Sequence, residues 1–168
     1  MSPEERAGDA VRRLVEEVRA ELARVGAVKV ELERLARLLT ADCPPDTRMS
    51  AAGHLHSFYT GCEAVLSRIA RDLGEMPQGD RWHQTLLAQA AAGREGRRPS
   101  VISAETFAAL FELLRFRHFF RVAYGVELVP EKLRAHASAA PAVHDRFRAE
   151  VETFLAALGA AAGAAARG

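Results

Sequence analysis

The chain has 168 residues, of which 49% are hydrophobic and 27% charged, a composition typical of one globular domain with its own core. Its net charge of +1 excludes a generally basic, histone-like protein, so contact with nucleic acid needs a local positive patch. The polar start MSPEERAGDA argues against a signal peptide, and no apolar run approaches the roughly 18 residues of a membrane span. We therefore expect a cytoplasmic protein without membrane contact.

The first predicted element is one long helix over about residues 3–39. Apolar residues recur there every seven positions, at Val11, Val18, Val25, Leu32 and Leu39. Gly26 is a poor helix former in its middle, and the sequence leaves open whether it breaks the helix. The CPPD segment at 43–46 ends the pattern, which favours an antiparallel helix hairpin over a separate coiled coil.

Two helices are predicted in the middle of the chain. One spans about residues 48–73, with Gly74 at the position of a left-handed C-cap. The next is short and carries Trp82, and residues 91–102 then form a loop rich in glycine and arginine. No segment between them has the length or pattern of a strand.

The last third of the chain is also predicted to be helical. Ser103 caps a helix that runs to about Tyr124 and ends at Gly125. Pro130 then opens a short helix and Pro141 another, and the tail 159–168 is expected to be disordered. The predicted fold class is all-α, an up-and-down bundle of four to five main helices in a single domain over residues 1–158.

Several common kinds of catalytic and metal site are missing from the sequence. Cys43 and Cys62 lie 19 positions apart and are interpreted as two reduced thiols. The zinc patterns H-E-x-x-H and C-x-x-C do not occur, nor do a phosphate-binding P-loop, a dinucleotide fingerprint or a nucleophile elbow. We therefore expect no metal and no cofactor.

Residues 113–125, LLRFRHFFRVAYG, concentrate positive charge and aromatic rings on one helix. Arg117 and Arg121 share a face, which Tyr124 continues, and Arg115 and His118 share the adjacent one. One interpretation is structural, with arginines that pair with acidic residues of neighbouring helices. The other is a phosphate-binding strip, held by phenylalanines that turn into the core and joined by cations of the loop: Arg94, Arg97 and Arg98.

The segment LRFRHFFRVAYGVEL, followed by PEKL, resembles the signature of the HepT-like group of HEPN domains. The preceding segments LHSFYTGCEAVLSRIARDLG, WHQTLL and RPSVIS resemble the same group, so the resemblance covers about residues 50–135. It implies an all-α bundle that forms homodimers, with helices of both subunits along one cleft. It also implies a metal-independent ribonuclease toxin that acts on RNA and is paired with a nucleotidyltransferase antitoxin.

The active motif of this group is Arg-x-x-x-x-His-x-Tyr. By resemblance, Arg117 is the catalytic arginine and Tyr124 the tyrosine that the antitoxin modifies, while Val122 stands at the histidine position. Arg115 and Arg121 are expected to bind RNA. A valine cannot take a proton, so activity is expected to be weakened or lost. His118 is a possible substitute base, although it points about 100° away from Arg117 around the helix and is better placed in the partner subunit.

Two alternatives to a ribonuclease stay open at this point. The first is a non-catalytic HEPN dimer that binds RNA or a partner protein through the same cleft, which the valine at position 122 favours. The second is a structural helical dimer that binds its partner through the long first helix.

Overall fold

The computed structural model describes residues 3–122 and 128–165, which fold into five helices without a strand. The helices are α1 (Pro3–Leu38), α2 (Pro45–Asp72), α3 (Trp82–Ala91), α4 (Ala104–Val122) and α5 (Pro130–Ala165). The predicted all-α bundle is confirmed. The two free cysteines are buried, as expected of reduced thiols.

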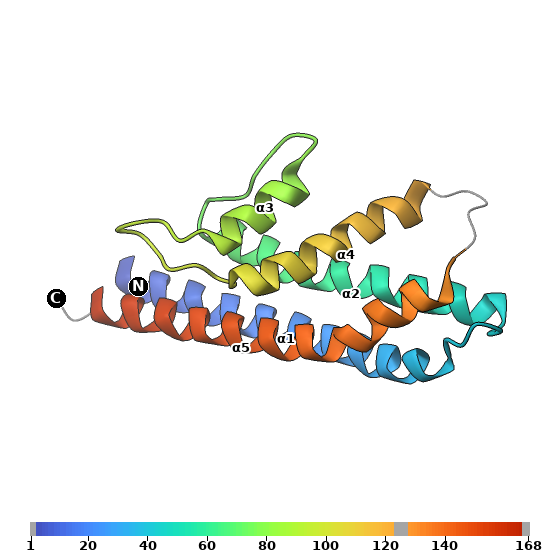
Figure 1. The fold of residues 1–168 in the computed structure, drawn as a ribbon. Helices are drawn as coiled ribbons and strands as arrows, with labels where there is room; N and C mark the ends of the chain where they lie inside the picture. The colour runs from blue at the N-terminus through green and yellow to red at the C-terminus, as the bar shows by residue number, and fades with distance from the viewer. Residues whose placement is uncertain (1–2, 123–127, 166–168) are drawn as a thin grey trace.

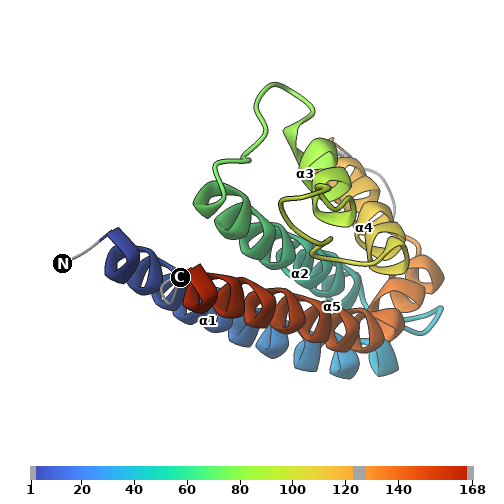
Figure 2. The same ribbon diagram turned by 90° about the vertical axis from the view of Figure 1, so that its left-hand side faces the viewer.

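The helices form an elongated bundle with α1 and α5 along its base (Figure 1). These two helices run in opposite directions, so the start of α1 and the end of α5 lie at the same end of the molecule. α2 packs against both of them, and α4 crosses α2 and contacts α5. α3 contacts only α2 and α4 among the described elements, and the end view places it on the side away from α1 (Figure 2).

Gly26 does not break α1, which continues through it to Leu38. Its role is close packing, because a β-carbon at this position would lie 3.4 Å from Nε2 of His144 on α5. The helix is held instead by a stripe of buried residues that face α2 and α5: Leu14, Val18, Leu22, Val25, Leu32 and Leu35. Tertiary packing of this kind outweighs the roughly 1 kcal/mol penalty of one helical glycine.

Three helix ends follow the local sequence signals. Pro45 occupies the first turn of α2, a position where its missing N–H costs nothing. Gly74 has a φ of 66°, and the N–H of Glu75 bonds the carbonyl of Ala70, which together make a left-handed C-cap after α2. Oγ of Ser103 accepts a hydrogen bond of 3.1 Å from the N–H of Thr106, so the predicted N-cap of α4 is confirmed.

The C-terminal region differs from the prediction of two short helices and a disordered tail. α5 is one helix of 36 residues that contains Pro141 and runs to Ala165. A proline inside a helix loses one hydrogen bond and strains the preceding turn. Here that local cost is offset by burial on both sides of Pro141, through Leu133, Ala137, Ala140, Val143, Phe147 and Val151. The predicted end of α4 at Gly125 lies outside the described residues.

Candidate functional site

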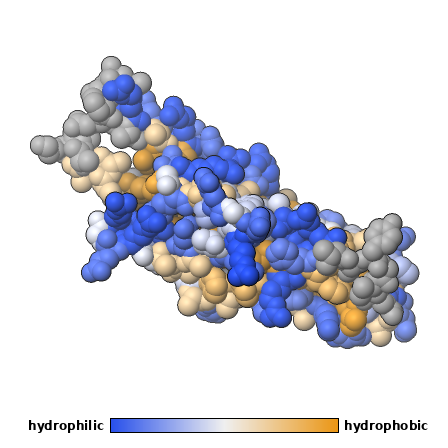
Figure 3. Space-filling view, turned by 90° about the horizontal axis from the view of Figure 1, so that it is seen from above, coloured by the Kyte–Doolittle hydropathy of each residue, from blue (hydrophilic) through white to orange (hydrophobic). Residues whose placement is uncertain are grey.

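The cationic residues of α4 divide into exposed ones and one that turns inward. Arg115, His118 and Arg121 are exposed, whereas Arg117 is partly buried between α4 and α2. Its guanidinium carbon lies 5.8 Å from the centre of the Tyr59 ring, within reach of a cation–π interaction. Figure 3 shows the face of the molecule over α3 and α4, where hydrophilic residues cover most of the surface and hydrophobic patches lie between them.

The structural interpretation of these arginines is not supported by the ion pairs found. Arg115 pairs with Glu112 at 3.3 Å, but both side chains are exposed and lie on the same helix. Within residues 3–122 and 128–165, none of Arg115, Arg117 and Arg121 forms an ion pair with another helix. The loop arginines behave differently, because Arg98 is buried and bonds Glu75 through Nη2 at 2.7 Å and Nε at 2.8 Å. Arg98 therefore anchors the loop.

Arg117 is an incompletely satisfied buried cation. Its Nε and Nη1 atoms are buried and have no hydrogen-bond partner in the part of the chain that the structure describes. A buried donor without an acceptor costs roughly 1–3 kcal/mol, and more when it is charged. An anionic oxygen that reached this guanidinium would give it an acceptor and a charge-assisted hydrogen bond.

His56 of α2 lies beside these arginines. Its ring is 6.2 Å from that of Phe120, and its Nδ1 atom is buried without a partner among the described residues. Burial lowers the pKa of His56, and the charges of Arg117 and Arg121 lower it further. The imidazole is therefore mostly neutral at pH 7 and adds no repulsion to the two arginines.

Glu63 is the centre of a buried hydrogen-bond network. It is 6% exposed, and its Oε2 atom accepts hydrogen bonds from Tyr59 Oη at 2.9 Å and from His83 Nδ1 at 2.6 Å. Burial raises the pKa of Tyr59 and Glu63 raises it further, so the phenol stays protonated and donates. His83 lies in the first turn of α3, where its ring packs at a tilt against that of Trp82, with centroids 3.8 Å apart.

These side chains form one contiguous set, which we call the polar seam. The seam connects α4 to α3 through α2, because Arg117 lies on Tyr59, Tyr59 bonds Glu63, and Glu63 bonds His83. The ring of His83 in turn contacts that of His118 edge-on, with centroids 6.2 Å apart. The members of the seam are His56, Tyr59, Glu63, His83, Arg117 and His118.

Four members of the seam were not predicted as site residues. These four are His56, Tyr59, Glu63 and His83. A signal was present, because residues 56, 59 and 63 fall on one face of α2, in the middle of its buried stripe. Polar groups inside a buried stripe need partners, and the partners are the functional candidates.

Two predicted site residues lie at or beyond the limit of the described part. Val122 is the last described residue of α4, five positions after Arg117, and its side chain is not described. Tyr124 lies outside the described residues, so its assignment as the modified tyrosine stays a prediction.

The phenylalanines of α4 only partly follow the prediction that all three turn into the core. Phe116 and Phe120 stack on each other with centroids 6.1 Å apart and pack against the core. Phe119 is 45% exposed, so the prediction is wrong for this residue. It borders a groove of about 300 Å³ between α4 and α5, lined by Glu112, Arg115, Phe116, Phe119, Leu128, Val129, Lys132, Leu133 and His136.

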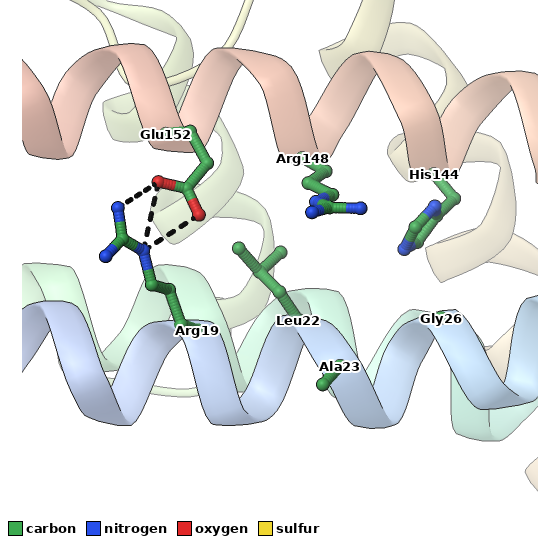
Figure 4. Close-up of a pocket in the computed structure, with 7 residues that line it drawn as sticks. All are labelled: Arg19, Leu22, Ala23, Gly26, His144, Arg148 and Glu152. Atoms are coloured by element: carbon green, nitrogen blue, oxygen red, sulfur yellow. Dashed lines mark hydrogen bonds and ion pairs between the residues drawn. The ribbon is translucent and has the colours of Figure 1, made fainter.

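A larger groove, of about 600 Å³, lies between α1 and α5 (Figure 4). Arg19 and Glu152 face each other across it and form an ion pair at 2.9 Å, with two further hydrogen bonds from Nε. Arg148 and His144 follow along the α5 side. The groove contains none of the seam residues, and Arg19, the cation on its α1 side, is already paired with Glu152. We therefore place the candidate site at the seam.

Within the described ranges, no three His, Cys, Asp or Glu side chains are grouped so that they could hold a metal ion. None of the helices, as far as they are described, is long and apolar enough to cross a membrane.

Residues 50–158, more than half of the chain, match the family described as HepT-like protein. This range contains the whole polar seam and all of α2 after its first turn, α3 and α4. No curated protein and no solved structure matches the chain. The five-helix bundle is the all-α architecture that the sequence resemblance implied. The chain belongs to the HepT-like proteins of the HEPN superfamily.

Proposed function

We propose that this protein binds RNA in a cleft along α4 and acts there as a metal-independent endoribonuclease, weakened by the valine at position 122. The observation that carries the proposal is the state of Arg117, whose Nε and Nη1 atoms are buried without an acceptor in the described part of the chain. A phosphate bound here would supply an acceptor, because a guanidinium group forms charge-assisted hydrogen bonds with phosphate oxygens.

The chemistry of RNA cleavage explains why this arginine matters. Without a metal ion, the 2′-hydroxyl attacks the adjacent phosphorus. The substrate is therefore RNA, because DNA lacks this hydroxyl. Arg117 would stabilise the negative charge that develops on the phosphorane. Val122 stands where the family motif has its general base, and such help is typically worth ~10²–10⁴-fold in rate. Tight binding with slow cleavage is therefore the expected behaviour.

The exposed cations of α4 extend the proposed RNA site. Arg115 and Arg121 are exposed on either side of Arg117 and would contact neighbouring phosphates. The net charge of the whole chain is +1, so the attraction is local and depends on these side chains. Binding should weaken as salt rises, because each neutralised phosphate releases counterions.

The proposed assembly is a homodimer through the groove between α4 and α5. Phe119 and Val129 border this groove and are 45% and 42% exposed, so covering them would remove apolar surface from water. A second copy that covers them would also bring a second set of Arg115, Arg117 and Arg121 to the cleft, as the family resemblance implies.

The proposed regulator is a nucleotidyltransferase antitoxin that acts with the protein in the cytoplasm. Tyr124 matches the motif tyrosine, two positions after Val122. A nucleotidyl group on this residue would add a phosphate near the motif arginine and exclude RNA by charge and by volume.

A non-catalytic RNA- or protein-binding module is the second candidate, and Val122 is the observation that favours it. Both candidates require the same cleft, whereas cleavage requires a proton acceptor in addition. They are distinguished by whether purified protein that binds RNA also cuts it in the absence of metal.

Binding can be tested with a fluorescent single-stranded RNA and the variant Arg117→Ala. Loss of charge-assisted hydrogen bonds worth about 1.5–3 kcal/mol should weaken binding by about 10–100-fold. Arg37→Ala is the matched control, since this residue is an exposed arginine of α1, a helix that makes no contact with α4. Equal affinity of both variants and the unmodified protein would show that RNA does not bind at Arg117.

A further inference from the structure

We propose that His83, oriented by Glu63, is the general base of this cleft and takes the place of the motif histidine that is absent at Val122. The inference rests on the proposed ribonuclease function and assigns a role to a residue of α3, outside the helix that carries the motif. The base would then come from a different element of the bundle than the arginine.

The bond between His83 and Glu63 fixes the state of the imidazole. Nδ1 of His83 lies 2.6 Å from Oε2 of Glu63, a short, charge-assisted hydrogen bond. A carboxylate can only accept, so the proton lies on Nδ1 and the lone pair on Nε2 is left to accept another. A carboxylate that holds a histidine in this way is the arrangement of a general base and its orienting group.

Glu63 is itself held in place on several sides. Its side chain is 8% exposed, and the hydroxyl of Tyr59 donates to the oxygen that also binds His83. The ring of Trp82 packs against the imidazole at a 30° tilt, with a centroid distance of 3.8 Å, which limits rotation of the ring. The side chain of His83 remains 15% exposed, so the ring is held firmly without being sealed from the surface.

The connection to Arg117 places the base and the phosphate-binding group in the same cluster. The guanidinium carbon of Arg117 lies 5.8 Å from the centre of the Tyr59 ring, and Tyr59 bonds the carboxylate that holds His83. On its other side, the imidazole of His83 lies 6.2 Å from that of His118, the residue next to Arg117 in the chain. The proposal requires both groups at one nucleotide linkage, because the 2′-hydroxyl and the phosphate that it attacks belong to the same linkage.

The other two histidines of the seam are less suited to the role. His118 is exposed, and within the described ranges its side chain has no hydrogen bond that would orient it. His56 has its Nδ1 atom buried without a partner, and no carboxylate bonds its ring in the described part of the chain. His83 alone among the three is bonded to a buried carboxylate.

The proposed step balances without a cofactor. Nε2 of His83 takes the proton of the 2′-hydroxyl, and the bond from the 2′-oxygen to phosphorus forms. The bond from phosphorus to the 5′-oxygen breaks, and that oxygen takes a proton from solvent water as it leaves. The imidazolium then returns its proton to solvent. The products are a 2′,3′-cyclic phosphate and a 5′-hydroxyl end, with no change in oxidation state.

The test measures binding and cleavage separately on the full-length protein. Binding is measured with a fluorescent 2′-O-methyl RNA, which cannot be cut, and cleavage with the unmodified RNA in buffer that contains a chelator. The variant is His83→Asn, because an asparagine amide can still donate to Glu63 but cannot act as a base. His54→Asn is the matched control, since this histidine of α2 lies outside the seam and bonds the carbonyl of Ser50, and thermal unfolding verifies that each variant is folded.

We expect the unmodified protein to cleave RNA to cyclic phosphate ends, and His83→Asn to slow this by about 10²-fold or more with unchanged affinity. His54→Asn should cleave as fast as the unmodified protein. Added imidazole should restore cleavage to His83→Gly, a rescue that a purely structural role of His83 would not produce.

Two outcomes overturn the inference and are distinct from failure of the proposed function. Cleavage by His83→Asn at the original rate would remove His83 as the base. Binding that depends on Arg117 without any cleavage would leave the RNA site in place and remove the base. If the unmodified protein does not bind RNA at all, the proposed function itself is wrong, and the inference falls with it.

Discussion

Arg117 places its guanidinium carbon 5.8 Å from the centre of the Tyr59 ring on the facing helix, with Nε and Nη1 buried and without acceptors in the described residues. Elsewhere in the molecule, the buried guanidinium of Arg98 bonds Glu75 and three backbone carbonyls. The two guanidinium groups therefore differ in how far the protein itself satisfies their donors. The contrast favours the proposal that Arg117 binds an external anion, and its unsatisfied donors should lower the free energy of unfolding.

That cost can be measured with Arg117→Met. Methionine keeps the apolar stem and removes a buried cation that lacks acceptors, so the free energy of unfolding should rise by about 1 kcal/mol. Arg98→Met is the matched control and should lower it by about 1–3 kcal/mol, because Glu75 then keeps only the longer ion pair with the exposed Arg94. Urea denaturation measures both. If Arg117→Met is as destabilising as Arg98→Met, Arg117 has a structural role instead.

Glu63→Ala should destabilise the fold strongly. Tyr59 and His83 would each lose the acceptor of a buried hydrogen bond, at roughly 1–3 kcal/mol per donor. Glu112→Ala removes the exposed partner of Arg115 and should change stability by less than about 0.5 kcal/mol. Chemical denaturation of the two variants compares these values directly. Similar small effects would mean that the network around Glu63 is not formed in solution.

Val122→His should restore cleavage to the variant that lacks His83. The substitution completes the family motif five residues after Arg117, so the double variant His83→Asn, Val122→His should cleave about 10²-fold faster than His83→Asn alone. Adding Arg117→Ala should abolish the gain, because a base is of little use when the phosphorane is not stabilised. The rates come from the same metal-free assay. A double variant that folds, binds RNA and cuts nothing would argue for the binding-module candidate.

Phe119→Asp should convert the proposed dimer into a monomer. The side chain is 45% exposed at the groove between α4 and α5, so a charge there is tolerated in one subunit but unfavourable in a closed interface. Val30→Asp is the control, at an apolar residue of α1 that is 59% exposed. Light scattering coupled to gel filtration gives the masses. A dimer that persists in Phe119→Asp would place the interface elsewhere.

Local patterns predicted the helices well where the signals are short in range. The seven-residue repeat of α1, the cap at Ser103 and the left-handed Gly74 each depend on a few neighbouring residues, and each is found in the structure. Pro141 misled the prediction, since its local preference for a helix start was overridden by the packing of α5 on α1 and α2. The packing on α1 joins residues more than one hundred positions apart, such as Gly26 and His144. No short-range sequence pattern can therefore reveal it.

The same limit explains why four of the six seam residues were missed. Glu63 and His83 lie 20 positions apart on different helices, and their 2.6 Å bond depends on where α3 docks on α2. The sequence predicted a cationic face on α4, but the inward turn of Arg117 and the outward turn of Phe119 depend on the angle at which α4 crosses the bundle. Rotation of a helix about its axis is set by its partners rather than by its own residues.

The most direct measurement of the central claim is a crystal structure of the protein with a short 2′-O-methyl single-stranded RNA. The account predicts a phosphate oxygen within hydrogen-bond distance of the guanidinium group of Arg117, with the sugar of the same linkage beside His83. RNA bound only at the 91–102 loop or in the groove between α1 and α5, with Arg117 still lacking an acceptor, would contradict it.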